Sequence, residues 1–139
     1  MMKKITVISK ILFLSLAFSL SNCHESTAQQ AAQATAVLAP DDFEAKALKA
    51  GVQLIDVRTP DEYKAGHISN AKNINFYAAD FKDEMGKLDK SKAIAVYCGV
   101  GGRSGKASTI LTQLGFKTIY DLQGGMTAWK AKGKKVSTE

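Results

Sequence analysis

Metal ligands and nucleotide-binding patterns are scarce in this sequence. Its 139 residues include two cysteines and two histidines, and no cluster with the spacing of a metal site is visible. The segment Arg103-Ser104-Gly105-Lys106 lacks the upstream glycine spacing of a phosphate-binding P-loop. The sequence therefore predicts neither a metal ion nor a cofactor.

Internal repeats and nucleic-acid-binding patterns are absent from the sequence as well. The formal net charge is +6, and it falls to +3 once Lys3, Lys4 and Lys10 leave with an N-terminal signal, because 16 basic and 13 acidic residues then remain. A nucleic-acid protein would show a basic stripe with interleaved aromatic residues, so we expect no nucleic-acid partner. The lysine cluster within 130–135 is interpreted as a solvated helix end, with contact to anionic lipid as the alternative. The modest basic excess would attract small anionic substrates.

Apolar runs long enough to cross a membrane are also missing. The run Ile11–Leu20 follows Lys3 and Lys4 and precedes small and polar residues, which is the layout of a secretory signal. It is too short for a membrane span. The sequence therefore predicts export.

The end of this signal segment resembles a bacterial lipobox. In Leu20-Ser21-Asn22-Cys23 the leucine and the small residue stand at the expected places, although Asn22 departs from the usual glycine, alanine or serine. The resemblance implies that residues 1–22 are cleaved, that Cys23 is lipidated, and that the protein is anchored in the bacterial cell envelope, on the periplasmic side or in the outer membrane. The alternative is ordinary cleavage after Ser26-Thr27-Ala28, which would give a soluble periplasmic protein.

The segment that follows, residues 23–39, is rich in alanine, glutamine and threonine and is predicted to be a flexible linker, with a short helix as an alternative. A disulfide between Cys23 and Cys98 is a further alternative. It is disfavoured because Cys23 lies far from the domain on this tether and because pairing would consume a reactive thiol.

Residues 40–139 are predicted to form one α/β domain of ordinary size. Apolar β-branched runs alternate with amphipathic segments, which predicts a parallel sheet covered by helices on both faces. The expected strands are Val52–Val57, Asn73–Phe76, Ala93–Tyr97 and Thr118–Leu122, and the expected helices are Asp41–Ala50, Asp61–Ala65, Asp80–Leu88, Arg103–Leu114 and Met126–Lys132.

Cys98, the only cysteine of this domain, lies between a predicted buried strand and a predicted helix. Gly99, Gly101 and Gly102 follow it, so the backbone can curl around the sulfur and point several N–H groups at it. A helix N-terminus, inward-pointing amides and a nearby guanidinium all stabilise a thiolate. The alternative role of a small buried apolar residue does not call for the Gly-x-Gly-Gly-Arg that follows, so we favour a reactive thiol.

Four blocks of the chain, in the right order between Pro40 and Lys134, resemble a rhodanese domain. They are Leu54-Ile55-Asp56-Val57-Arg58-Thr59-Pro60-Asp61-Glu62-Tyr63; Gly66-His67-Ile68 with Ala71 and Asn73-Ile74; Tyr97-Cys98 with its loop to Arg103-Ser104; and Leu122-Gln123-Gly124-Gly125-Met126 before Ala128-Trp129. The resemblance implies a rhodanese-like fold, a central parallel β-sheet with helices on both faces.

The resemblance also implies a thiosulfate sulfurtransferase. Cys98 would take sulfane sulfur from a small anionic donor such as thiosulfate, become a persulfide, and pass the sulfur to cyanide or a thiol. The amides of Gly99, Val100, Gly101, Gly102, Arg103 and Ser104 would cradle the outer sulfur, and Arg103 would add positive charge for the donor. Family members often carry a basic residue and then serine or alanine after the cysteine, where this chain has Gly99 and Val100.

Two other functions stay open at this point. Cysteine-dependent phosphatases and arsenate reductases separate the cysteine and arginine by five residues, whereas four separate Cys98 from Arg103, and no general acid is identifiable. A non-catalytic module that binds a sulfur-carrying or redox partner is the other alternative, and the intact Cys98 argues against it.

Four further residues are assigned supporting roles. Asp56 and Arg58 follow a predicted strand at the end where ligands bind in open α/β sheets, and we interpret them as an ion pair that fastens a loop, with the site mouth as the alternative. His67 is expected to order a turn rather than act as a base. Trp129 is expected to pack the last helix on the sheet, with contact to a substrate as the alternative.

Overall fold

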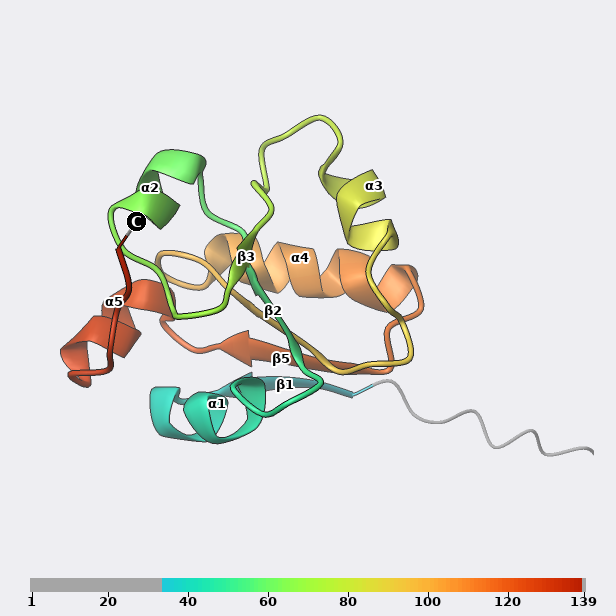
Figure 1. Cartoon of the computed structure of the whole chain (residues 1–139). Helices are drawn as coiled ribbons and strands as arrows, with labels where there is room; N and C mark the ends of the chain where they lie inside the picture. Colours follow the sequence, from blue (N-terminus) through green and yellow to red (C-terminus); the bar gives the residue numbers. More distant parts are fainter. Residues whose placement is uncertain (1–33, 139) are drawn as a thin grey trace, which may run out of the picture. The chain divides into compact units, whose positions relative to one another are not determined.

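The computed structural model describes residues 34–138 and shows a five-stranded sheet with all strands parallel (Figure 1). The strand order is β1-β5-β4-β2-β3. The elements along the chain are β1 (Ala34–Leu38), α1 (Pro40–Ala47), β2 (Gln53–Asp56), α2 (Pro60–Lys64), β3 (Lys72–Asn73), α3 (Phe81–Gly86), β4 (Ile94–Tyr97), α4 (Gly102–Gln113), β5 (Thr118–Leu122) and α5 (Gly125–Ala131). The predicted α/β architecture is confirmed.

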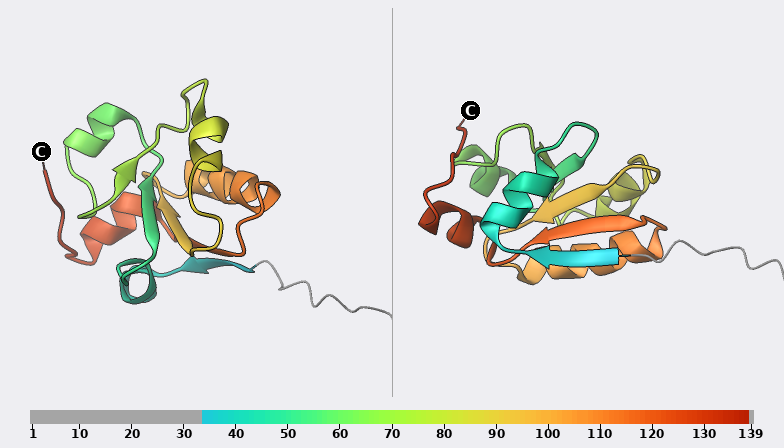
Figure 2. Two further views of the ribbon diagram at one scale, coloured as in Figure 1. Left: turned by 45° about the vertical axis from the view of Figure 1, so that its right-hand side comes forward. Right: turned by 90° about the horizontal axis from the view of Figure 1, so that it is seen from below.

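Helices cover both faces of the sheet, as the two views of Figure 2 show. Because side chains alternate along a strand, neighbouring strand residues enter different cores. Ile55 and Val96 pack with α3 and α4, whereas Leu54 and Tyr97 pack with α1 and α5. All four residues of β4 are buried, as expected for a central strand of a parallel sheet. The chain leaves this strand directly into the segment that holds Cys98.

The first strand corrects one prediction from the sequence. The sequence predicts a flexible linker at residues 34–38, but they form the edge strand β1, which pairs with β5 from Ala34 opposite Thr118 to Leu38 opposite Leu122. Ala34, Thr35 and Val37 are exposed, so the segment has no strong apolar pattern of its own. The backbone groups of β5 supply its partner, and strand formation depends on such context.

The other elements occur where they were predicted, with shifted ends. The predicted strand Asn73–Phe76 overlaps the two-residue strand β3 only at Asn73, and α1 ends at Ala47 rather than at Ala50. The predicted signal segment 1–22 and Cys23 lie outside the described residues. Within residues 34–138, no helix has the length and apolar character needed to cross a bilayer.

Candidate active site

Cys98 lies at the carboxyl end of β4, in the short turn that leads into α4. Its side chain is buried, and the N–H of Gly101 donates a hydrogen bond to Sγ over 3.1 Å. Gly101 has a φ of 106°, in the left-handed region that favours glycine. The glycine therefore lets the turn fold back so that its amide points at the sulfur.

Hydrogen bonds around Sγ outweigh the effect of burial on the thiol. Burial by itself would raise the pKa of Cys98, but the Ser104 hydroxyl and the backbone N–H groups of Ser104, Gly101 and Val100 act on the sulfur together and lower that pKa below its ordinary value. Donors that face the sulfur stabilise its anion more than its neutral form. The turn is thus built to hold a negatively charged sulfur.

The start of α5 holds this turn in place from the other side. The N–H groups of Met126 and Thr127 donate to the carbonyl oxygens of Cys98 and Gly99 over 2.8 and 3.1 Å. A Cβ on Gly125 would lie 2.4 Å from the Cys98 carbonyl oxygen, so only glycine permits this approach. Because α5 binds the carbonyl oxygens of Cys98 and Gly99, the turn is held in a conformation in which its N–H groups point toward the sulfur.

Sequence reasoning missed the link between α5 and the turn. From the sequence, Gly124 and Gly125 are only part of a block that resembles the rhodanese domain. Both have positive φ, 71° and 56°, and a glycine pair at the start of a helix is the signal that could have indicated a close backbone approach.

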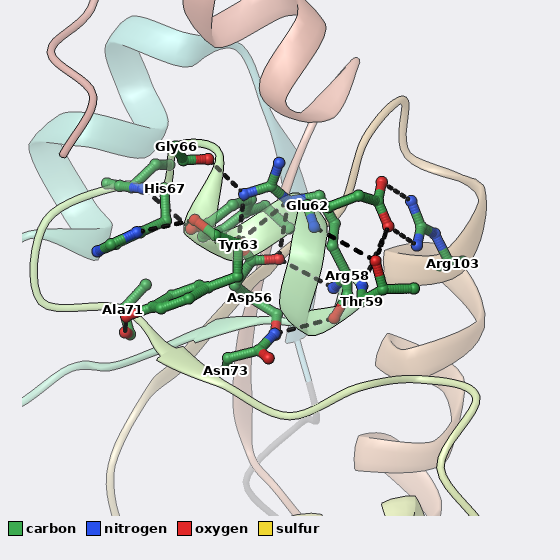
Figure 3. A network of polar contacts seen from close by, with 12 residues as sticks. Asp56, Arg58, Thr59, Glu62, Tyr63, Gly66, His67, Ala71, Asn73 and Arg103 are labelled. Carbon is green, nitrogen blue, oxygen red and sulfur yellow. Dashed lines mark hydrogen bonds and ion pairs between the residues drawn. The ribbon is translucent and has the colours of Figure 1, made fainter. Parts of the chain in front are cut away.

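Arg103, in the first turn of α4, is held by Glu62 of α2 (Figure 3). Its Nη1 and Nη2 donate to the two carboxylate oxygens over 2.6 and 2.7 Å. The hydrogen bonds from Arg103 are the main reason that the pKa of Glu62 falls to about 2, and Glu62 in turn raises the pKa of Arg103. The expected cation beside Cys98 is therefore present, but a carboxylate compensates its charge.

Gly99 and Tyr77 complete the surroundings of this guanidinium. A Cβ on Gly99 would lie 3.3 Å from Nη2 of Arg103, so the absence of a side chain at position 99 leaves room for the arginine. The ring of Tyr77 also lies close to the guanidinium, with its centroid 5.7 Å from Cζ. Tyr77 and Val100 are both largely exposed, at 68% and 73%, and they give this part of the surface an apolar component.

Asp56 and Arg58 form a buried ion pair near the end of β2 (Figure 3). Arg58 Nη2 donates to Oδ2 of Asp56 over 2.6 Å and to the Gly66 carbonyl over 2.7 Å. The side-chain amide of Asn73 donates to the carbonyls of both residues over 3.0 and 2.9 Å. These bonds tie the segment after β2 to the turn after α2 and to β3, and they involve no atom of Cys98.

His67 and Trp129 also take part in packing. His67 stacks on the Tyr63 ring with centroids 3.8 Å apart, and its backbone N–H and carbonyl pair with Ser137. Trp129 is buried against Phe43 and donates from Nε1 to the Lys135 carbonyl over 2.9 Å. Both roles fasten α2, α5 and the C-terminal segment.

Two other features of the described residues lie apart from this chemistry. A hollow of about 290 Å³ is bordered by residues 47–52 and by Leu54, Ser69 and Asn70, and none of the residues 98–104 lines it. Residues 34–138 contain no group of three or more histidine, cysteine or acidic side chains that could hold a metal ion.

Comparisons with known proteins agree on one family. The model of the rhodanese-like domain matches residues 39–132. An uncharacterized protein of Bacillus subtilis, YqhL, is 39% identical over 100 residues, which cover 70% of this chain and 76% of that protein. The thiosulfate sulfurtransferase GlpE of Coxiella burnetii is 37% identical over 83 residues, covering 60% of this chain and 76% of that protein.

Solved structures agree with the sequence comparisons. A rhodanese-related protein from Thermoplasma volcanium superposes with a TM-score of 0.64 at 32% identity, over 74% of this chain and 98% of that one. A rhodanese-like domain protein from Staphylococcus aureus gives a TM-score of 0.62 at 30% identity, over 74% and 97% of the two chains.

Proposed function

This chain belongs to the family of rhodanese-like domains, and from that premise we propose that it is a sulfurtransferase in which Cys98 carries the transferred sulfur as a persulfide. The observation that supports the proposal is the turn 98–104, in which backbone N–H groups and the Ser104 hydroxyl face a single sulfur and lower its pKa. The curated relatives named thiosulfate sulfurtransferase point to the same reaction class.

The Cys98 sulfur takes part in both steps of the reaction: it first accepts a sulfur atom from the donor and then releases it to the acceptor. The thiolate attacks the outer sulfur of thiosulfate, a new S–S bond forms, and the S–S bond to sulfite breaks, so that sulfite leaves with the bonding electron pair. The Cys98 persulfide anion then lies among the N–H groups of the turn, which stabilise its charge. Cyanide or a thiolate attacks the outer sulfur, thiocyanate or a new persulfide leaves, and the Cys98 thiolate is regenerated without any external oxidant.

Thiosulfate is the donor with which we propose to assay the protein, and cyanide or a thiol is the acceptor. The amides of the turn supply the attraction for the anionic donor, because Gly99 and Val100 bring no charge and Arg103 is already paired with Glu62. The same pairing weighs against phosphatase chemistry, since a phosphate-binding arginine has to be free to form a bidentate contact with its substrate.

Export and lipid anchoring complete the proposal and rest on residues 1–23 of the sequence alone. We propose that the chain is cleaved before Cys23, that Cys23 is lipidated, and that the domain is displayed in the bacterial cell envelope. Labelling with a fatty acid in cells tests this directly: label is expected on the wild type and not on Cys23→Ala. Label on neither protein would favour ordinary cleavage and a soluble periplasmic domain.

The test of sulfur transfer is intact-protein mass spectrometry before and after incubation with thiosulfate. The expected result is a gain of one sulfur atom that cyanide removes, and no gain in Cys98→Ser. A folded wild-type protein that gains no sulfur would exclude thiosulfate as the donor. A phosphate-ester assay on the same sample would then test the phosphatase alternative, and full function of Cys98→Ser in cells would favour a non-catalytic module.

A further inference from the structure

A buried carboxyl group lies on the α4 side of the sheet next to the active-site turn. Asp121 is in β5 and follows Ile119 on the same face of the strand, the face that packs against α4. It is only 5% exposed. Ile119, two residues earlier on this face, belongs to the apolar core. Apolar packing alone therefore does not explain why a carboxyl group is buried at position 121.

The facing helix, α4, carries two buried hydroxyl groups on the side of the sheet where this carboxyl lies. Ser104 and Ser108 lie one turn apart on α4 and are both buried, and a Cβ on Gly105 would lie 3.9 Å from Oδ2 of Asp121. Oδ1 of Asp121 and the Ser108 hydroxyl oxygen have no hydrogen-bond partner within residues 34–138. A polar strip with unmet hydrogen-bonding capacity therefore crosses the interface between α4 and β5.

Ser104 connects this strip to the sulfur. Its hydroxyl donates to the Gly101 carbonyl oxygen over 3.2 Å, and the same hydroxyl lowers the pKa of both Cys98 and Asp121. A hydroxyl group has one hydrogen to donate. The sulfur, the carboxylate and the carbonyl oxygen therefore compete for the same hydrogen.

Charges near Asp121 are few. α4 and α1 are the helices that pack on β5; α1 covers the opposite face with Phe43 and Ala47, and β1 and β4 carry no charged side chain. The charged or titratable groups on the α4 side are Cys98, Arg103, which is paired with Glu62, and Lys106, which is exposed. Burial raises the pKa of Asp121, and Ser104 counteracts this only in part.

We propose that Asp121 is a positioning residue for Cys98, and that its protonation state decides whether the Ser104 hydroxyl donates to the sulfur. When Asp121 is protonated, its O–H donates to Ser104 Oγ and the Ser104 hydrogen is free for the thiolate or persulfide. When Asp121 is ionised, the carboxylate takes that hydrogen and the sulfur loses a donor. The two groups therefore titrate as a coupled pair.

The test measures how the reactivity of the Cys98 thiolate depends on pH, and it does not require sulfur transfer. Iodoacetamide alkylation of the purified full chain is followed against pH on the Cys98 peptide, so that Cys23 does not contribute. Asp121→Asn keeps the size, and its amide can donate to Ser104 as the protonated carboxyl does. The expected result is a Cys98 pKa lowered by about one unit, seen as roughly tenfold faster alkylation at acidic pH, and a titration that changes from two steps to one.

Two further variants test the route through Ser104. Ser104→Ala should slow alkylation at the same pH. In the double variant Ser104→Ala/Asp121→Asn, the rate should differ from that of Ser104→Ala by less than about twofold, because the effects of coupled residues are not additive. Thr109→Ala, which removes an exposed hydroxyl from the same helix, is the matched control and should leave the profile unchanged. A profile of Asp121→Asn that superimposes on the wild type, or an equal shift with and without Ser104, overturns the proposal.

A measurement on the wild-type side chain covers the case in which Asp121→Asn does not fold. The ¹³C chemical shift of the Asp121 carboxyl should show a second titration step together with Cys98, and Cys98→Ala should remove that step. A single step unaffected by Cys98→Ala overturns the proposal. The inference rests on the proposed role of Cys98 as the thiolate, but alkylation needs no sulfur donor, so failure of sulfur transfer would be a separate result.

Discussion

Arg103 and Glu62 are 41 positions apart and are joined by two hydrogen bonds of 2.6 and 2.7 Å between a guanidinium and a carboxylate. Glu62 is itself fixed, because the N–H and the hydroxyl of Thr59 both donate to its Oε2 over 3.0 Å at the start of α2. The arginine nearest to Cys98 is thus anchored to a neighbouring helix, and its charge is compensated before any donor arrives.

Removal of the Glu62 charge should therefore improve the capture of thiosulfate. In Glu62→Gln, Arg103 keeps its place in α4 but loses its anionic partner, and the net charge beside the turn becomes more positive. We expect KM for thiosulfate to fall about threefold, as a gain of about 0.6 kcal/mol would give. Steady-state kinetics with thiosulfate and cyanide measure this.

Glu44→Gln is the matched control for that variant, because Glu44 also accepts from a cation, Lys134, over 2.6 Å, but lies on α1. It makes the same change in net charge without affecting Arg103. An equal fall in KM in both variants would show that overall charge is responsible, and an unchanged KM in Glu62→Gln would show that Arg103 does not contribute to donor capture.

The same ion pair predicts how stability depends on pH. The pKa of Glu62 is lowered to about 2 from an unfolded value near 4.5, so its contribution to stability is complete above pH 4.5 and is lost as the pH falls toward 2. Glutamine can still form the capping box of α2, which isolates the charge effect. Urea unfolding should show Glu62→Gln to be less stable than the wild type at pH 7 and nearly equal to it near pH 2. A constant difference across this range would contradict the assignment.

Local patterns in the sequence were enough to predict the turn that holds Cys98. An apolar run that ends at Tyr97 and a helical period that begins near Arg103 fix both sides of the turn, and the glycines between them indicate its curvature. Cys98 and the strand-helix alternation depend on neighbours in the chain, so pattern reasoning could find them.

Contacts between distant segments could not be predicted in this way. The bonds between α5 and the turn join Met126 to Cys98, and β1 forms only because β5 offers it an edge. The role of Ser104 as a side-chain donor also depends on where the helix places its hydroxyl. In each case the tertiary arrangement, not the local sequence, supplies the partner.

The buried pair Asp56 and Arg58 is expected to support the fold without setting the chemistry of the thiol. Asp56→Ala would leave the Arg58 guanidinium buried without its anion, and breaking such a pair costs about 3 to 5 kcal/mol. The free energy of unfolding from urea titrations should fall by roughly that amount, while the Cys98 alkylation profile of the folded protein stays as in the wild type. A shift of that profile would place the pair in the site itself.

The close contact between α5 and the turn leads to the last prediction. In Gly125→Ala the new Cβ would lie 2.4 Å from the Cys98 carbonyl oxygen and 2.7 Å from the carbonyl carbon of Gly99, so α5 has to move away and its hydrogen bonds to the turn are lost. We expect at least a tenfold loss of kcat/KM and a higher Cys98 pKa, because the N–H groups of the turn are no longer held toward the sulfur.

Gly133→Ala separates this effect from backbone strain: Gly133 has a φ of 66°, similar to the 56° of Gly125, but nothing lies within 4 Å of its added Cβ. Both variants should lose about 1 kcal/mol of stability to strain, and only Gly125→Ala should lose activity. Equal activity in the two variants would mean that α5 does not hold the turn in its reactive form.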